Sequence, residues 1–211
     1  MLRIDLYTEI TCPWCLVGQY RLDKVLEERF TNLVVDIHHH PVLLMPNAPD
    51  AGLYIPDLLR GRYGVTDPKA AFARPEAEAR ASGLNLDLSR QLYAYPTQAA
   101  HALIEAARER GTQHELAVAI TKAYFISIRN IASADVLAEV GTGYGFGRDE
   151  ALAIVRDPVW RARVEHEAEN SAAAGARSVP HFVFAGGGAI NGARSEDEIA
   201  LFIRQAISTT E

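Results

Sequence analysis

The sequence has few cysteines, with only two among its 211 residues. Two cysteines are too few for the disulfide framework that holds small secreted domains together. The chain also lacks a basic excess: its formal net charge is −6, and no Lys/Arg cluster suggests a nucleic-acid partner. No apolar run is long enough to span a bilayer, so we expect no membrane partner.

The first residues lack the apolar core of a signal peptide, because Asp5 and Glu9 interrupt the stretch MLRIDLYTEI. We therefore expect a cytoplasmic protein. The composition is that of an ordinary soluble globule, with 48% hydrophobic and 23% charged residues. A chain of this length can bury a core without cross-links, as one domain or as one domain with a large insertion.

Hydrophobic periodicity predicts a β-α-β unit at the start of the chain. Residues 3–7 alternate as in a strand, an amphipathic helical pattern runs from the cysteines to about Arg29, and a second strand ends near Pro41. Helical periodicity then dominates from about Leu53 to Asp157. The late run HFVFA, the turn GGG and the run AIN predict a β-hairpin. The outline is thus β-α-β, a helical insertion, and α-β-β-α.

Capping patterns predict where several helices begin. Thr97 can cap the helix that ends at Gly111, and Thr112 begins the next helix. Thr112 and Glu115 have the spacing of a capping box, as do Ser195 and Glu198 for the last helix. Asp157-Pro158 combines an N-cap with proline at the first helical position.

Cys12 and Cys15 flank Pro13 and Trp14 at the predicted junction between the first strand and helix. A C-x-x-C pair in this position is a thioredoxin-like redox pattern. Unpaired N–H groups and the helix dipole stabilise negative charge there, which lowers the pKa of the Cys12 thiol. Pro13 suits the first helical turn. Cys15 lies within reach of Cys12 and can resolve a mixed disulfide.

Two other interpretations of the cysteine pair stay open at this point. A zinc site needs two more ligands, yet there is no second C-x-x-C, and His38, His39 and His40 lie on a strand whose side chains alternate between faces. We therefore predict no metal site and partly exposed histidines on the sheet. In the third interpretation the cysteines only fill space in the core.

Several segments together resemble the DsbA-like branch of the thioredoxin superfamily, in particular its cytoplasmic FrnE-like members. The resemblance covers nearly the whole chain and rests on EITCPWCLVG, YPTQAAHAL, KAYFISIRNIASADVLAEV and AAAGARSVPHFVFAGGGAINGA. It implies an α/β, thioredoxin-like fold with a mixed central sheet and a large inserted all-helical domain. Residues 1–45 and 158–211 would form the thioredoxin-like domain, and residues 46–157 the insertion.

The resemblance also implies roles for particular residues. Cys12 would be the nucleophile and Cys15 the resolving cysteine. Pro180 would be a cis-proline facing the active site, so that the backbone of Val179 is exposed for pairing with an extended substrate. The alternative is an ordinary trans proline at a strand start.

Four further residues belong to the predicted site. Pro13 and Trp14 would contact substrate, with Trp14 exposed beside the cysteines. His181 would border the active site, where its cation would favour the thiolate, or would be an exposed strand residue. Glu9 falls where relatives often have an acidic residue, and it could carry protons to or from Cys15. The simpler interpretation is a solvated carboxylate at a strand end.

The sequence departs from periplasmic DsbA at Trp14, where DsbA has a histidine. Without that histidine we expect Cys12 to be less acidic, and the pair less oxidising, than in DsbA. The chain also has no further cysteine pair for an internal relay.

The first functional hypothesis is a thiol–disulfide oxidoreductase that exchanges its dithiol with disulfides of proteins, peptides or small thiols. It has no bound cofactor, glutathione is a candidate co-substrate, and the protein is a monomer or homodimer. The second hypothesis comes from a sister branch, the chromene-carboxylate isomerases and kappa-class glutathione transferases. These bind glutathione at the same helix N-terminus and usually have serine at the first cysteine position. The third is a non-enzymatic partner-binding module.

Overall fold

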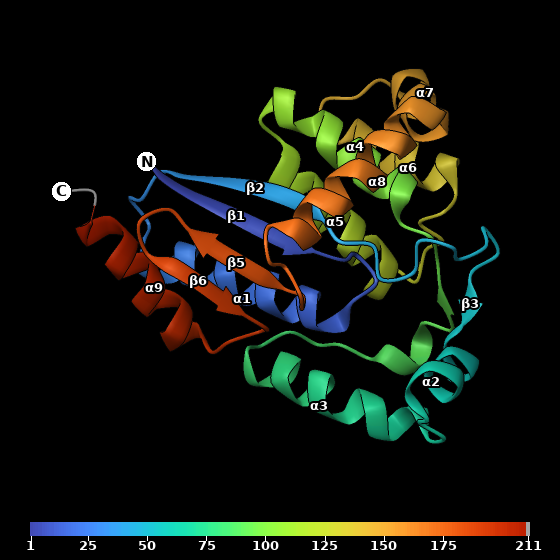
Figure 1. Cartoon of the computed structure of the whole chain (residues 1–211), viewed down its shortest axis with the longest axis horizontal. Coiled ribbons are helices and arrows are strands. Elements are labelled where there is room, and N and C mark those ends of the chain that lie inside the picture. The colour runs from blue at the N-terminus through green and yellow to red at the C-terminus, as the bar shows by residue number, and fades with distance from the viewer. Residues whose placement is uncertain (210–211) are drawn as a thin grey trace.

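A mixed four-stranded sheet forms the centre of the computed structural model, which describes residues 1–209 (Figure 1). The last two residues of the predicted segment 158–211 lie outside the described residues. The strand order is β2-β1-β5-β6. β1 pairs in parallel with β2 and antiparallel with β5, which pairs antiparallel with β6. These strands are β1 (Leu2–Thr8), β2 (Val35–Pro41), β5 (His181–Phe184) and β6 (Gly188–Asn191). The predicted mixed central sheet is confirmed.

Helices α1 (Pro13–Arg29) and α9 (Glu196–Ser208) pack against this sheet through one apolar cluster. Its largest fully buried members are Ile4, Leu6, Leu22, Phe182, Phe184 and Ile199. Burying each side chain of this size contributes about 1.5–3 kcal/mol before the entropy of ordering the chain is counted. The cluster therefore holds α1, which begins at the cysteine pair, firmly on the sheet.

The chain between β2 and β5 is mostly helical (Figure 1). Its later helices lie beside β2, with α5 (Gln113–Phe125) and α8 (Pro158–Ala173) in contact with that edge strand. The earlier helix α3 (Pro68–Ala81) lies against α1 instead. In order, the elements between β2 and β5 are β3 (Leu53–Tyr54), α2 (Ile55–Tyr63), α3 (Pro68–Ala81), η1 (Leu88–Arg90), β4 (Tyr93–Ala94), α4 (Gln98–Ala106), η2 (Ala107–Arg110), α5 (Gln113–Phe125), α6 (Ala134–Thr142), α7 (Arg148–Arg156) and α8 (Pro158–Ala173). A second apolar cluster forms the core of this block; its largest fully buried members are Leu103, Leu116, Ile120, Tyr124, Ile131 and Leu137. The antiparallel pair β3–β4 was not predicted, since two residues per strand are too few to show alternation.

Two of the four predicted helix caps are present and two are absent. Asp157 accepts a hydrogen bond from Val159 N–H (2.8 Å), and Ser195 forms the predicted capping box. The predicted caps at Thr97 and Thr112 are wrong, because neither residue has the extended backbone of an N-cap and neither side chain caps its helix. The Thr112 hydroxyl instead donates to the Tyr144 carbonyl (2.9 Å).

One buried arginine joins the sheet domain to the helical block. Arg21, on α1, is 5% exposed, and its guanidinium donates hydrogen bonds to four residues of α3 and of two loops. The acceptors are Ser82 Oγ (2.7 Å), the Ala193 carbonyl (2.8 Å), the Arg194 carbonyl (3.2 Å) and both the carbonyl (3.1 Å) and carboxylate (2.6 Å) of Glu78. All five N–H donors of the Arg21 guanidinium are thus hydrogen-bonded.

Within the described residues, no helix combines the length and the apolar character needed to cross a membrane.

Candidate active site

Cys12 occupies the residue position that immediately precedes the first turn of α1. β1 ends at Thr8, Cys12 has an extended backbone, and Pro13 is the first helical residue. The backbone N–H groups of Trp14 and Cys15 approach the Cys12 sulfur and favour its anionic form. The predicted placement of the pair at a strand-to-helix junction is therefore confirmed.

The pKa values of the two thiols are shifted in opposite directions. Both cysteines are free and nearly buried, Cys12 being 8% and Cys15 3% exposed. A hydrogen bond from the Cys15 thiol, with the two backbone N–H groups, lowers the pKa of Cys12 despite its burial. Burial, followed by that hydrogen bond and the charge on Cys12, raises the pKa of Cys15. A reduced pair of this kind ionises first at Cys12, as a nucleophile requires, and keeps the Cys15 proton.

Glu9 is 1% exposed, so the interpretation as a solvated strand-end carboxylate is wrong. Its Oε2 accepts hydrogen bonds from Leu44 N–H (3.0 Å) and from the Thr97 hydroxyl (3.3 Å). Its Oε1 accepts one from Thr11 N–H (3.4 Å). Three donors, two of them from distant parts of the chain, therefore hold this buried carboxylate, as a buried charge requires.

Glu9 also lies next to Cys15. The Glu9 backbone N–H donates to Cys15 Sγ at 3.5 Å, and the carboxylate is near enough to help raise the pKa of Cys15. Nε2 of His101, a ring 4% exposed, lies 3.9 Å from Glu9 Oε1. That nitrogen is buried and forms no hydrogen bond within the described residues. His101 lies in α4, far from Glu9 in the sequence, so local sequence patterns could not place the two side chains together.

The loop before β5 approaches α1 from the other side. The Val179–Pro180 peptide bond is cis. A Cβ atom added to Gly18, in the second turn of α1, would stand only 2.7 Å from Pro180 Cγ. The Pro180 carbonyl accepts a hydrogen bond from Gly192 N–H (2.7 Å). The structure thus brings Pro180 against the helix that carries both cysteines.

Trp14 is half-buried rather than exposed. The Arg74 guanidinium carbon lies 5.4 Å from the Trp14 ring centroid, in a cation–π arrangement. Val179, Arg74 and Arg194 line one surface cavity of about 370 Å³ with Trp14. The structure therefore brings Val179 and Trp14, two of the predicted substrate contacts, to the same depression.

His181 is 7% exposed, so the alternative of an exposed strand residue is wrong. Its Nδ1 forms a hydrogen bond with Asn191 Oδ1 (2.7 Å), and its ring centroid lies 5.4 Å from that of Tyr7. These contacts direct the ring toward β1 and β6.

The three consecutive histidines do not share one environment. His38 and His40 are half-buried and bind neighbouring carboxylates, whereas His39 is buried under α5. His39 Nε2 lies 2.9 Å from His114 Nδ1, and His114 Nε2 lies 2.8 Å from Asp23 Oδ1. Burial lowers the pKa of His39 well below its usual range. In residues 1–209 no group of three or more His, Cys, Asp or Glu is arranged to hold a metal ion.

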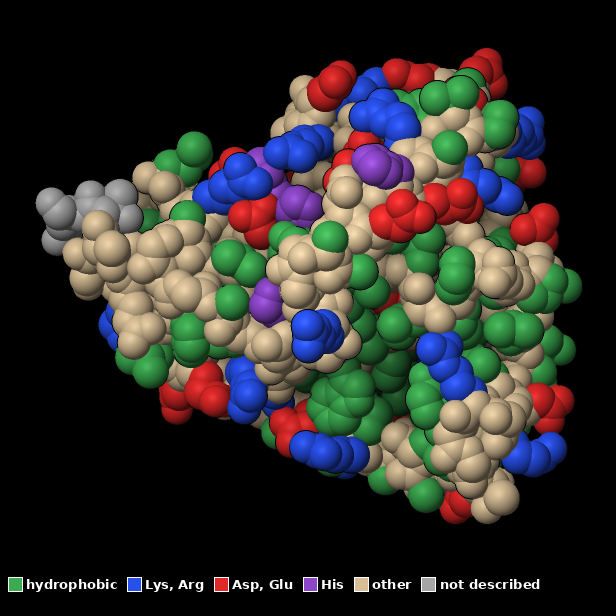
Figure 2. Space-filling model, viewed as in Figure 1, with side chains coloured by type: hydrophobic (Ala, Val, Ile, Leu, Met, Phe, Trp, Pro, Cys, Tyr) green, Lys and Arg blue, Asp and Glu red, His purple; other side chains and the backbone are tan. Residues whose placement is uncertain are grey.

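A cavity of about 380 Å³ opens beside Cys12, and sequence reasoning missed it. A hollow lined by hydrophobic side chains is visible on this face in Figure 2. Its walls come from the start of α1, the connection after β2, α2, α3, η1, β4 and the end of α5. The apolar members include Leu44, Met45, Ile55, Leu58, Leu59, Phe72, Pro75, Leu88 and Phe125. Arg62 is the one charged residue among the described residues that line it. Helical periodicity identifies apolar faces, but it does not show which of them remain uncovered.

The sequence matches the family of DSBA-like thioredoxin domains over residues 3–204. No match was found among curated proteins. Among solved structures, a probable DsbA oxidoreductase from Streptomyces coelicolor has a TM-score of 0.87 at 26% identity, covering 99% of this chain and 91% of that one.

Two more distant structures share the fold. The cytosolic disulfide reductase DsbM from Pseudomonas aeruginosa, with GSH, has a TM-score of 0.67 at 18% identity, covering 98% of this chain and 99% of that one. A 2-hydroxychromene-2-carboxylate isomerase has a TM-score of 0.70 at 14% identity, covering 98% of this chain and 94% of that one.

Proposed function

The chain belongs to the family of DSBA-like thioredoxin domains, and from this premise we propose that it is a FrnE-type thiol–disulfide oxidoreductase. Its substrates are disulfides or thiols of proteins, peptides or small molecules. The observation that supports this activity is that the pKa of Cys12 is lowered while the pKa of Cys15 is raised, at the N-terminus of α1. A pair of core-filling cysteines has no need of such a difference.

The reaction proceeds in two exchange steps. The Cys12 thiolate attacks one sulfur of a substrate disulfide, forms a mixed disulfide and expels the other sulfur as a thiolate. Cys15 then loses its proton and attacks Cys12. The Cys12–Cys15 disulfide forms, and the second substrate thiolate leaves and is protonated. The substrate has gained two electrons, and the protein dithiol has lost them.

The reverse sequence oxidises a substrate dithiol, so the redox potential of the compartment sets the direction of the reaction. We place the protein in the cytoplasm, where thiols are kept reduced, and so assign it a reductase or isomerase role. Two molecules of glutathione would then restore the dithiol and leave as oxidised glutathione. The Pseudomonas reductase structure with GSH supports glutathione as a co-substrate.

Cys12→Ser is expected to abolish reduction of insulin disulfides, because serine cannot form the mixed disulfide. Cys15→Ser is expected to accumulate that mixed disulfide, detectable by mass spectrometry after acid quenching. The two variants are matched controls, since each replaces one sulfur by oxygen. Full turnover by Cys12→Ser would exclude this mechanism.

Glu9 is the proposed proton acceptor for Cys15 in the second step. Glu9→Gln keeps the size of the side chain but removes its basicity, so resolution of the mixed disulfide should slow by about 10²-fold at neutral pH. If the carboxylate acted only through its charge, the substitution would have the opposite effect, because that charge helps raise the pKa of Cys15. The lifetime of the mixed disulfide in quenched-flow experiments separates the two. A shorter lifetime in Glu9→Gln rules out the proton-acceptor role.

A glutathione-dependent isomerase or transferase is the second candidate. The shared fold with the chromene-carboxylate isomerase and the apolar cavity beside the same helix N-terminus favour it. This function predicts saturable glutathione binding by Cys12→Ser and isomerisation of a chromene carboxylate without net thiol oxidation. Calorimetric titration with glutathione and an isomerisation assay test both points, and absence of binding would remove the candidate.

A further inference from the structure

We propose that the cavity beside Cys12 selects small disulfides in which a bulky, preferably aromatic, group carries a carboxylate. The proposal rests on the oxidoreductase function and names the substrate class of that site. The sulfur atom would meet Cys12, the apolar group would fill the cavity, and the carboxylate would bind Arg62.

The composition of the cavity wall is the first argument. Leu58 and Leu59 extend from α2 and Phe72 from α3, facing the same space as Cys12. α2 contains no fully buried residue, although three of its nine side chains are Ile or Leu. An amphipathic helix normally buries such a face. Here the apolar side chains line a cavity, which an apolar ligand would cover.

The size of the cavity favours a small molecule. A volume of about 380 Å³ is near the lower end of the range of about 300–1,000 Å³ typical of small-molecule sites. Its walls come from at least four separate segments, so a bound group would be surrounded on several sides. A cavity of this size suits one ring or one branched chain.

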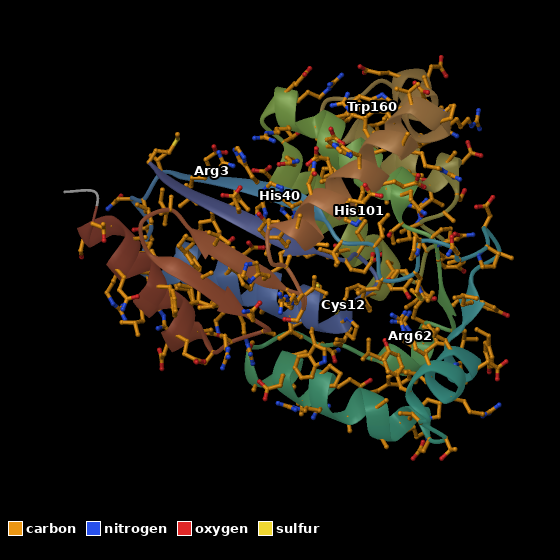
Figure 3. All side chains as sticks on the ribbon, in the orientation of Figure 1. Arg3, Cys12, His40, Arg62, His101 and Trp160 are labelled. Atoms are coloured by element: carbon orange, nitrogen blue, oxygen red, sulfur yellow. The ribbon has the colours of Figure 1, made fainter. Side chains whose placement is uncertain are left out.

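The charge of the wall is the third argument. Arg62, on α2, and Cys12 lie on opposite sides of the space (Figure 3). Within residues 1–209, one N–H group of Arg62 donates to the Leu44 carbonyl (2.8 Å), and the guanidinium carbon lies 5.6 Å from the Tyr63 ring centroid. The guanidinium has five N–H donors, and its fork fits a carboxylate with two parallel bonds.

The chemical step is balanced as in the general reaction. The Cys12 thiolate attacks the disulfide sulfur attached to the group in the cavity and expels the other half as a thiolate. Cys15 then displaces the bound half. One protein dithiol and one disulfide give one protein disulfide and two thiols, and no other reactant takes part in this single turnover.

The test compares single-turnover rates of the reduced protein with four disulfides: dithiodibenzoate, its neutral diamide, dithiodipropionate and oxidised glutathione. Each rate is divided by the rate with dithiothreitol at the same pH, which removes differences in intrinsic reactivity. We expect the aryl carboxylate to exceed its diamide by at least about tenfold, the factor that one charge-assisted hydrogen bond provides. It should exceed dithiodipropionate and oxidised glutathione by a similar factor of about tenfold, because these lack a ring that buries apolar surface in the cavity.

Two variants probe the two halves of the recognition. Arg62→Gln should lower the rate with the aryl carboxylate about tenfold and leave the diamide unchanged. Leu58→Trp should fill the cavity and slow both aryl disulfides but not oxidised glutathione, which also shows that the protein is folded. Arg60→Gln is the matched control, because Arg60 lies on the same helix but pairs with Asp57 outside the cavity. Unchanged ratios in Arg62→Gln and Leu58→Trp overturn the proposal.

A binding measurement separates this proposal from the function on which it rests. (Methylthio)benzoate is a thioether with a free carboxylate, and it cannot undergo thiol–disulfide exchange. It is titrated into Cys12→Ser while the fluorescence of Trp14, a cavity residue, is followed. Saturable binding that weakens about tenfold in the Arg62→Gln double variant supports the cavity assignment, whether or not any disulfide is reduced. Reduction of oxidised glutathione without such binding leaves the oxidoreductase function standing and overturns the substrate class.

Discussion

Gly18 lies where α1 and the Pro180 loop approach most closely, and adding one methyl group there tests that contact. In Gly18→Ala the new Cβ would stand 2.7 Å from Pro180 Cγ and 3.2 Å from Phe182 Cζ. Carbon atoms normally approach to about 3.5–4.0 Å, so a movement of about 1 Å is required. Neither neighbour yields easily, because one is a closed ring and Phe182 is fully buried.

Two effects of opposite sign decide the stability of Gly18→Ala. Replacing a helical glycine by alanine stabilises by up to about 1 kcal/mol. Overpacking costs about 1–3 kcal/mol. We therefore expect the free energy of unfolding to change between nothing and a loss of about 3 kcal/mol. Displacing the Pro180 loop by about 1 Å should also slow disulfide exchange by up to about 10²-fold.

Gly61→Ala is the matched control, since Gly61 lies in α2 and an added Cβ meets nothing within 4 Å. It should gain up to about 1 kcal/mol and keep its exchange rate. Urea unfolding of the two variants should thus differ by about 1–3 kcal/mol. If Gly18→Ala is as stable as Gly61→Ala and exchanges disulfides at the wild-type rate, the close approach of Pro180 to α1 is refuted.

Two further predictions concern the thiols and the buried arginine. Because the pKa of Cys12 is lowered, its alkylation by iodoacetamide should reach a plateau at lower pH than an ordinary thiol, with Cys15 reacting only at higher pH. Cys15→Ala should move the Cys12 midpoint upward, and an unmoved midpoint would show that the Cys15 thiol does not support the thiolate. Arg21→Met leaves the buried Ser82 hydroxyl and two partly buried carbonyls without their donor, so urea unfolding should show a loss of about 3 kcal/mol. The exposed Arg60→Met should change stability by no more than about 0.5 kcal/mol, and equal effects would contradict the structural role of Arg21.

The position of the cysteine pair at a helix N-terminus could be predicted from the sequence because the information is local. Cys12, Pro13 and Cys15 stand between an alternating run and a helical run, and that order alone fixes a helix N-terminus near the thiols. The Asp157 and Ser195 caps were predicted for the same reason, since each depends on residues within one helical turn.

The environment of Glu9 and the cavity could not be predicted, because both depend on long-range packing. Glu9 is buried by contacts with Leu44 and Thr97, which are 35 and 88 residues away in the chain. Thr97 had the sequence character of a helix cap, but its hydroxyl binds the buried carboxylate instead. Periodicity likewise identifies α2 as a helix without showing that its apolar side chains face the Cys12 thiol.

In the proposed exchange reaction, the hydrogen bonds of Glu9 link the docking of the helical block to the redox state of the cysteine pair. Leu44 lies on the connection into that block and Thr97 at the start of α4, yet both donate to one carboxylate beside Cys15. A displacement of either donor changes the stabilisation of the buried charge, and hence the free energy of removing the Cys15 proton. Linkage is reciprocal, so closing or opening the disulfide must change how tightly these segments dock. Amide hydrogen exchange at Leu44 in the dithiol and disulfide forms would measure this linkage at the helical block rather than at the cysteines.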